Sequence, residues 1–285
     1  MGHHFVPQAY LRAFQNPDNP GTIWTYPRKG EPRLAAIKNV AQSSGFYDSE
    51  IESDLNTLIE APANPILDML RRGEPISSEQ RYRIALYVGT MIKRVPRSRE
   101  RGKAIIPEAL DQTVARLRNQ IIQKASKRAV EPERVKTWLS NLDAVEAQFR
   151  EQPPSAVFDV VRLPWPSRAI VDTVFGMQWR ILCAEPPEMF ITGDNPAFFF
   201  EDTGIARETA ELCFPLSPTR CLHCSHARIP DVDIAFMPFD RETVREMNRR
   251  IATAATSIVM AHVKCSWPMT LLRRKPDLRR INWAS

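Results

Sequence analysis

"MQWRILCAEPPEMFITGDNPAFFF", residues 177–200, holds apolar runs rich in aromatic and β-branched residues, separated by turn formers. Such runs, bounded by Pro, Gly, Asn or Asp, are typical of β-strands. The runs "MQWRILCA" and "MFITG" flank Glu185, Pro186 and Pro187, which predicts a β-hairpin. The later runs "AFFF", "ELCFPLS" and "RCLHCS" add further strands. We therefore expect a carboxyl-terminal antiparallel sheet.

Helical patterns lie on both sides of this stretch. A short helix is expected near residues 165–175, just before the first strand. After the strands, "RETVREMNRRIATAATSIVMAH" at residues 241–262 predicts a helix that covers one face of the sheet. The run "VKCSW", residues 263–267, is expected to form a closing strand.

The middle of the chain is predicted to be helical. The clearest helix start is Ser77, because Gln80 follows at the spacing of a capping box. Pro96 ends this helix, and the Arg-rich residues 96–104 are expected to form a loop before two more helices, at 110–121 and 132–149. Residues 51–70 predict either two short helices or one helix kinked by its prolines.

The amino-terminal part adds a short helix and a hairpin. The helix follows "HHFVP", and the hairpin is expected in "GTIWTYPRKGEPRLAAI", residues 21–37. The whole chain is therefore expected to be α+β, with an amino-terminal helix and β-hairpin, a central helical region, and a carboxyl-terminal antiparallel sheet with a covering helix. We expect a single domain over residues 1–285, with a helical subregion at about 77–150 and a sheet subregion at about 155–270.

Composition indicates a globular chain. It has 285 residues, 43% of them hydrophobic, which is enough to bury a full core. No run of about 18 apolar residues occurs, and the start lacks the pattern of a signal peptide. Five cysteines, an odd number in apolar surroundings, indicate reduced and buried thiols. A cytoplasmic protein without membrane association is expected.

Positive charge is concentrated in one stretch. The formal net charge is +6, yet residues 93–128 alone hold eleven basic and three acidic residues, a net charge of +8. Such a stretch suits a phosphate-rich partner, either nucleic acid or another phosphate-bearing ligand. The candidate phosphate-binding residues are Arg94, Arg97, Arg99 and Arg101. The alternative is a solvated helix face without a partner.

Two adjacent histidines, His3 and His4, lie at the amino end. An imidazole that titrates near neutral pH is suited to a general base or a metal ligand. The stretch "HHFVP" also has the His-His-x-x-Pro pattern of HNH-type nucleases, but the helix expected directly after it is in the wrong order for them. A structural anchor at the amino end is the alternative.

The stretch "TGDNP", residues 192–196, places Asp194 beside Asn195 between two apolar strands. A carboxylate at the edge of an apolar sheet, next to an amide donor, suits a general base or a metal ligand. Because Asp and Asn before Pro also form turns, a structural turn is the alternative. Asp194 and His4 are the preferred catalytic pair.

Two weaker features remain. Glu60 lies eight residues after Glu52, about two helical turns, so both carboxylates are able to reach one cleft, or simply lie in solvent. The string "CLHCSH" holds Cys221 and Cys224 at a spacing typical of zinc ligands, but a strand would direct them to opposite faces. The sequence therefore does not identify a metal ion or a cofactor.

Several stretches resemble a known family. They are "HHFVPQAYLRAF", "IKRVPR", "MFITGDNPAFF", "FPLSP" and "MNRRIATAA", spread over nearly the whole chain. In this order they are similar to the bacterial family catalogued as domain of unknown function 4238. One departure is Gly193, which stands where the family usually has Ser. The resemblance implies one family-wide unit and no established activity.

Two functional hypotheses follow. The first is a hydrolase, in one version a metal-assisted phosphodiesterase or nuclease, with His3, His4, Asp194 and Asn195 at the reaction centre and Glu60 assisting. The second is a module without chemistry that binds nucleic acid or an acidic partner through its basic helices. The chain lacks the glycine-rich loops of kinases, NTPases and dinucleotide enzymes, which excludes those classes.

Overall fold

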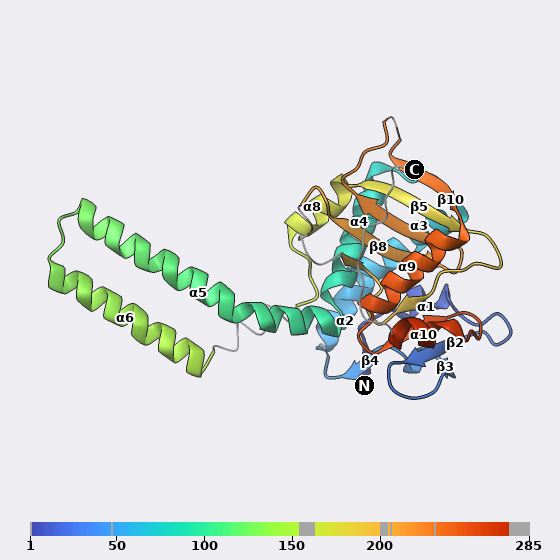
Figure 1. The fold of residues 1–285 in the computed structure, drawn as a ribbon, viewed down its shortest axis with the longest axis horizontal. Helices are drawn as coiled ribbons and strands as arrows, with labels where there is room; N and C mark the ends of the chain where they lie inside the picture. The colour runs from blue at the N-terminus through green and yellow to red at the C-terminus, as the bar shows by residue number, and fades with distance from the viewer. Residues whose placement is uncertain are drawn as a thin grey trace. The chain divides into compact units, whose positions relative to one another are not determined.

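The computed structural model describes residues 2–46, 48–153, 163–199, 205, 207–230 and 232–273. The chain divides into two compact units, Met1–Pro96 with Pro164–Ser285, and Arg97–Leu163. The first unit holds all the described strands and the shorter helices, and the described part of the second is formed mainly by two long helices (Figure 1). The predicted α+β class is confirmed. The single domain over residues 1–285 stays a prediction.

The largest sheet of the first unit has five strands, in the order β10-β5-β9-β8-β7. Neighbours run antiparallel except β10 and β5, which run parallel, so the prediction of a purely antiparallel sheet is wrong at this edge. The strands are β5 Gln178–Ala184, β7 Phe198–Phe199, β8 Glu211–Ser217, β9 Arg220–Ser225 and β10 Ile234–Phe239.

A second sheet is antiparallel and has the order β3-β2-β11-β6. Its strands are β2 Thr22–Pro27, β3 Arg33–Ala36, β6 Thr192–Gly193 and β11 Ile258–Ala261. The predicted hairpin at residues 21–37 is confirmed by the pairing of β2 with β3. A third, two-stranded sheet pairs β1 Gly2–His4 with β4 Gln42–Ser44.

The predicted hairpin between residues 177–184 and 189–193 is wrong, because β5 and β6 belong to different sheets. Both sides of the intervening loop bond instead to the turn between β8 and β9. The amide of Ala184 donates to the carbonyl of Thr219 at 3.0 Å, and the amide of Phe190 donates to that of Pro218 at 2.7 Å. In a hairpin, the backbone amides of Ala184 and Phe190 would donate to the opposite strand, but here they donate to the turn between β8 and β9.

The helices of the first unit follow the predicted order up to α9, and α10 lies where a closing strand was expected. They are α1 Gln8–Arg12, α2 Ser49–Asp54, α3 Ala61–Arg72, α4 Ser78–Lys93, α8 Arg168–Gly176, α9 Arg241–Ala254 and α10 Trp267–Arg273, with short turns η1 Ile37–Asn39 and η2 Leu55–Glu60. Ser77 caps α4, accepting from the amide of Gln80 at 3.2 Å, and its own amide donates to the Gln80 side chain at 2.7 Å. The predicted capping box is confirmed.

The last elements of the chain have other bounds and types than predicted. We expected one helix over residues 241–262, but α9 ends at Ala254 and β11 begins at Ile258. The β-branched residues Ile258 and Val259 favour a strand there, and the second sheet supplies partners on both sides. The expected closing strand at 263–267 is likewise wrong, because Trp267 begins helix α10.

The five-stranded sheet separates two clusters of buried apolar side chains. Along β5, Trp179 and Ile181 belong to a cluster shared with α1, α3, α4 and α8. Leu182 belongs to a second cluster, shared with α9 and β11. Residues at even spacing on a strand lie on one face, so the buried apolar residues of β5, β8 and β9 belong to one cluster or the other according to the face on which they lie.

The described helices of the second unit are α5 Pro96–Lys127, whose first residue Pro96 belongs to the first unit, and α6 Pro132–Glu151. Ion pairs between Arg118 and Asp143 and between Arg150 and Asp111 show that these helices run antiparallel. The loop predicted for residues 96–104 is wrong, because these residues form the first turns of α5. Proline is accepted at the start of a helix, where its missing amide needs no acceptor, and the Arg, Glu and Ala residues that follow favour a helix.

Candidate functional site

His3 and His4 lie on the small strand β1. They pair with Ser43 and Gln42 of β4. The ring Nε2 of His4 lies 3.1 Å from the carbonyl oxygen of Lys38, a hydrogen-bonding distance. This arrangement anchors the amino end to residues 38–44, as the structural alternative expects.

Arg94 gathers two of the other predicted residues. Its side chain is only 1% exposed, and its Nη1 lies 2.6 Å from Oε1 of Glu60. Its Nη2 donates to the carbonyl oxygen of His4 at 2.5 Å. Glu60 and the backbone of His4 are therefore joined through a buried guanidinium, which is placed to stabilise the fold and cannot reach a phosphate at the surface without leaving this site.

Asp194 and Asn195 bind the end of α9. The carboxylate of Asp194 accepts from the amides of Thr256, Ser257 and Ile258 at 2.7, 2.6 and 3.2 Å. The Nδ2 of Asn195 donates to the carbonyl of Ala254 at 3.0 Å. Burial raises the pKa of Asp194, although the amides act in the opposite direction. Within the described residues, no hydrogen bond joins this carboxylate to the ring of His4.

The remaining predicted arginines belong to the second unit. Arg97, Arg99 and Arg101 lie on the first turns of α5, where Arg97 and Arg99 are half-buried and Arg101 is exposed. Each of them makes polar contacts. They are thus in a different unit from Arg94, which belongs to the unit that contains the sheets.

The two cysteines with zinc-like spacing lie on β9. Cys221 belongs to the apolar cluster beneath α9, and Cys224 belongs to the cluster on the other face of the sheet. This is the arrangement expected for strand residues three apart. Over the part of the chain that the structure describes, no group of three or more His, Cys, Asp or Glu residues is placed to hold a metal ion.

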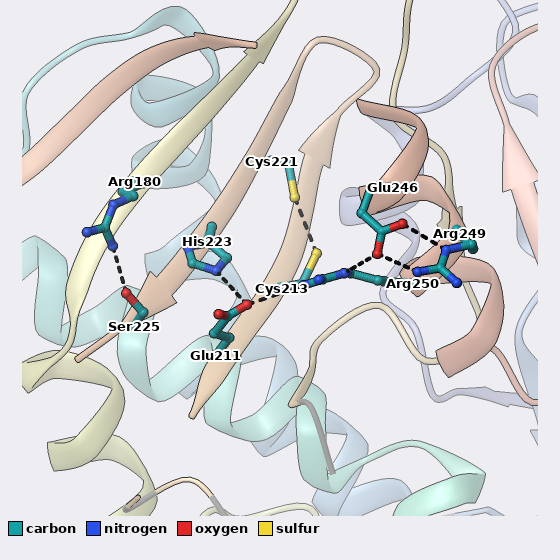
Figure 2. A network of polar contacts seen from close by, with 9 residues as sticks. All are labelled: Arg180, Glu211, Cys213, Cys221, His223, Ser225, Glu246, Arg249 and Arg250. Atoms are coloured by element: carbon teal, nitrogen blue, oxygen red, sulfur yellow. Dashed lines mark hydrogen bonds and ion pairs between the residues drawn. The ribbon is translucent and has the colours of Figure 1, made fainter. Parts of the chain in front are cut away.

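A row of polar side chains occupies the face of the sheet beneath α9. In the strand register, His223 of β9 lies opposite both Arg180 of β5 and Cys213 of β8. One step along, Ser225 lies opposite Glu211. These residues alternate with the buried residues of the other face, so they all point to the same side. Figure 2 shows Glu211, Cys213 and His223 on the side toward α9, and the pair of Arg180 and Ser225 farther from that helix.

Helix α9 completes this group with Arg250, which is fully buried. Its Nη1 lies 3.2 Å from Oε2 of Glu211, and the same oxygen lies 3.5 Å from Nε2 of His223. Its Nε lies 2.8 Å from Oε1 of Glu246, one turn back on α9 (Figure 2). On β5, Arg180 donates to the hydroxyl of Ser225 at 2.7 Å. We call Arg180, Glu211, His223, Ser225, Glu246 and Arg250 the α9 polar cluster.

The protonation states in the α9 polar cluster follow from burial and charge. Burial lowers the pKa of His223 and outweighs the nearby carboxylate, so the imidazole is neutral at neutral pH. Burial opposes the charge on Glu211, but the hydrogen bonds and charges of His223 and Arg250 outweigh it and lower its pKa. Because the guanidinium of Arg250 is permanently charged, we assign the anionic form to Glu211 and the neutral form to His223.

Comparison with known proteins gives one match. The model of the family described as "Protein of unknown function (DUF4238)" matches residues 2–264. The chain belongs to this family. No curated protein and no solved structure matches. Every member of the α9 polar cluster lies within the part of the chain that DUF4238 covers.

Sequence reasoning did not find the centre of the α9 polar cluster in this DUF4238 chain. Glu211, His223 and Arg250 were not among the predicted site residues. Two signals were present in the sequence: the polar residues His223 and Ser225 alternate with Leu222 and Cys224, and Arg250 lies in "MNRRIATAA", a stretch that carries the family resemblance. The missing information was which face of the sheet α9 covers.

Among the residues that the structure describes, no helix combines the length and the apolar character needed to cross a bilayer. All five cysteine thiols are free.

Proposed function

We propose that this DUF4238 protein is a hydrolase that cleaves phosphoesters with His223 as general base. The observation that carries the proposal is the shared oxygen Oε2 of Glu211, which lies within reach of both His223 and Arg250. A buried imidazole, an orienting carboxylate and a fixed cation are the groups that activated-water hydrolysis requires. This replaces the pair of His4 and Asp194, whose polar atoms have other partners.

The chemistry follows from the tautomer. A neutral His223 that donates Nε2–H to Glu211 carries its lone pair on Nδ1. Nδ1 accepts a proton from water, the water oxygen forms a bond to phosphorus, and the bond from phosphorus to the leaving oxygen breaks. The imidazolium then returns its proton to that oxygen. Arg180, on the same face, is placed to neutralise the phosphate charge.

Hydrolysis at His223 also requires that a substrate reach this side chain. His223 is 0% exposed, so a substrate reaches it only when α9 and the sheet separate locally. The cytoplasm is the proposed setting, which the free thiols support.

The test uses bis(4-nitrophenyl) phosphate and 4-nitrophenyl phosphate as substrates. We expect His223→Asn to lower the rate by about 100-fold or more, the usual effect of removing a general base. His226→Asn is the matched control, because its ring bonds the carbonyl of Ile205 and stands outside the cluster. Hydrolysis of neither ester by the wild-type protein, or equal rates for both variants, rejects the proposal.

A second candidate is supported by the charge of α5. Lys103, Arg116, Lys124 and Lys127 are exposed on this helix, and none of them forms an ion pair with a described residue. A row of unneutralised cations along a long helix suits the phosphates of nucleic acid.

The measurement for this candidate is fluorescence anisotropy with a labelled 20-base-pair duplex at several salt concentrations. If the duplex binds through its phosphates, the affinity should fall steeply as the salt concentration rises. The double variant K124E/K127E should also bind the duplex about tenfold more weakly, or worse. Arg168→Glu, at an exposed position on α8, is the control. Affinity that does not respond to salt, or that survives K124E/K127E, rejects nucleic-acid binding by α5.

A further inference from the structure

A cavity of about 570 Å³ lies in the first unit, on the side of β5 opposite the α9 polar cluster. It is bounded by the amino end of α4, the carboxyl end of α8, and Arg228, Val232, Asp233, Ile234 and Phe236. Arg81 in its wall packs on Trp179, and Trp179 points away from the face that carries Arg180 and His223. The cavity is therefore separate from the proposed hydrolytic centre.

Arg81 is a buried cation with which no described carboxylate forms an ion pair, although the charge of Asp233 acts on it electrostatically. It is 8% exposed, and its guanidinium donates to the carbonyls of Asp233 and Met177 at 3.1 and 2.5 Å. Its Nε has no hydrogen-bond acceptor, and no described carboxylate forms an ion pair with it. The rings of Trp179 and Phe175 lie 4.7 and 5.7 Å from its central carbon. A cation buried in this way is costly unless another group supplies negative charge.

Further positive charge lies around the same cavity. Arg228 also lines the wall, and its Nη2 donates to the carbonyl of Gly176 at 2.7 Å. Ser77 and Ser78, at the amino end of the 16-residue helix α4, line it as well. The amides of a first helical turn attract anions. Among the described residues that line the cavity, Asp233 is the acidic one, and Arg81 and Arg228 are the basic ones.

The rest of the lining is apolar. Phe175 and Phe236 contribute aromatic rings, and Ile76 and Ile234 contribute branched side chains. The volume lies within the range of about 300–1,000 Å³ that is typical of small-molecule sites. Apolar walls with a few convergent polar groups are the usual composition of such sites.

We propose that this cavity binds a small organic anion with an aromatic body. The acidic group of the ligand lies against Arg81, Arg228 and the amino end of α4. Its ring lies against Phe175 and Phe236. The ligand supplies the negative charge that Arg81 lacks, and its apolar body excludes water from the rings.

The experiment is a calorimetric titration of the full chain with indole-3-acetate and with its neutral analogue indole-3-acetamide. The acid is expected to bind at least about tenfold more tightly than the amide, since a charge-assisted hydrogen bond contributes about that factor or more. Arg228→Gln should weaken binding of the acid by about tenfold or more, and Phe236→Ala should weaken both ligands.

Arg83→Gln is the matched control, because Arg83 lies on the same helix, pairs with Glu79 and does not line the cavity. Its affinity for the acid should stay within about twofold of the wild type. Arg228 is exposed, so R228Q is expected to fold, whereas substitution of the buried Arg81 risks the fold. Phenyl phosphate and 8-anilinonaphthalene-1-sulfonate extend the probes to a phosphate and a sulfonate.

Three outcomes overturn the proposal. They are equal affinity for the acid and the amide, unchanged affinity in R228Q, and no binding of any of the three aromatic anions at about 10 mM, where even a weak site is occupied. Because none of these measurements involves hydrolysis, their failure is independent of the chemistry proposed for His223.

Discussion

Arg94 and Glu60 form a buried ion pair in which Nη1 lies 2.6 Å from Oε1, and the same guanidinium also binds the carbonyl oxygen of His4. The pair joins the end of η2 to the residue that follows α4 and to the first strand. The two charges depend on each other, because Arg94 is 1% exposed and Glu60 only 13% exposed, so solvent replaces a lost partner poorly.

Glu60→Gln is therefore expected to lower the free energy of unfolding by about 3–5 kcal/mol, the usual cost of leaving a buried charge without its partner. Urea denaturation measures the change. Glu79→Gln is the control, since Glu79 pairs with Arg83 in solvent, and we expect little change there. A small effect of Glu60→Gln would mean that Arg94 finds another partner.

Asp194→Asn should act on stability. The amide cannot replace a carboxylate that accepts three backbone amides, because one of its two ends is a donor. We expect a loss of about 2–4 kcal/mol in denaturant unfolding. Asp172→Asn, at an exposed ion pair of α8, should leave stability nearly unchanged. If Asp194→Asn unfolds like the wild type but abolishes phosphoester hydrolysis, Asp194 is catalytic after all.

Gly193 allows a close approach of two segments. A Cβ at this position would lie 3.2 Å from the Cβ of Ala255 and 3.3 Å from the carbonyl oxygen of Ile258, tighter than ordinary contacts. Gly193→Ser, the residue usual in the family, should cost about 1–2 kcal/mol. Combining it with Ala255→Gly should recover part of the loss, and a double-mutant cycle measures the coupling. Additive effects would show that the strain lies elsewhere.

His223 is expected to make stability depend on pH. Its folded pKa is below its unfolded value of about 6.5, so the unfolded chain binds a proton that the folded chain refuses. The stabilisation is complete above pH about 6.5 and is lost as pH falls from there toward the folded pKa. Comparing urea unfolding at pH 7.5 and 5.5, His223→Gln should show a smaller loss on acidification than the wild type, and His226→Gln a loss like that of the wild type. An equal loss in His223→Gln contradicts the assignment.

Elements fixed by neighbouring residues could be predicted from the sequence. The β2–β3 hairpin and the start of α4 at Ser77 both depend on contacts within about 15 residues, and both are confirmed. The partners of β5 and β6 could not be predicted, because they are decided by segments far along the chain. Local patterns identify a strand, whereas its neighbours depend on the fold as a whole.

The candidate site, too, depends on contacts between segments that are far apart in the sequence. Glu60 and Arg94 were both selected from the sequence, yet as parts of different sites, and the structure joins them in one ion pair. Glu211, His223 and Arg250 come from three separate elements. Only the register of β8 with β9 and the position of α9 bring them together, and neither can be inferred from residue spacing.

Strand β11 lies between β2 and β6, and Ala261 of β11 pairs with Trp24 of β2. A ribosome therefore has to reach Ile258, far beyond β2 and β3 in the sequence, before this sheet acquires β11. Until then β2 and β3 form a hairpin in which β2 has an unpaired edge, and this edge is exposed to chaperones and proteases in the nascent chain. Premature termination before residue 258 would remove the middle of that sheet, with far greater consequences than the loss of a peripheral tail.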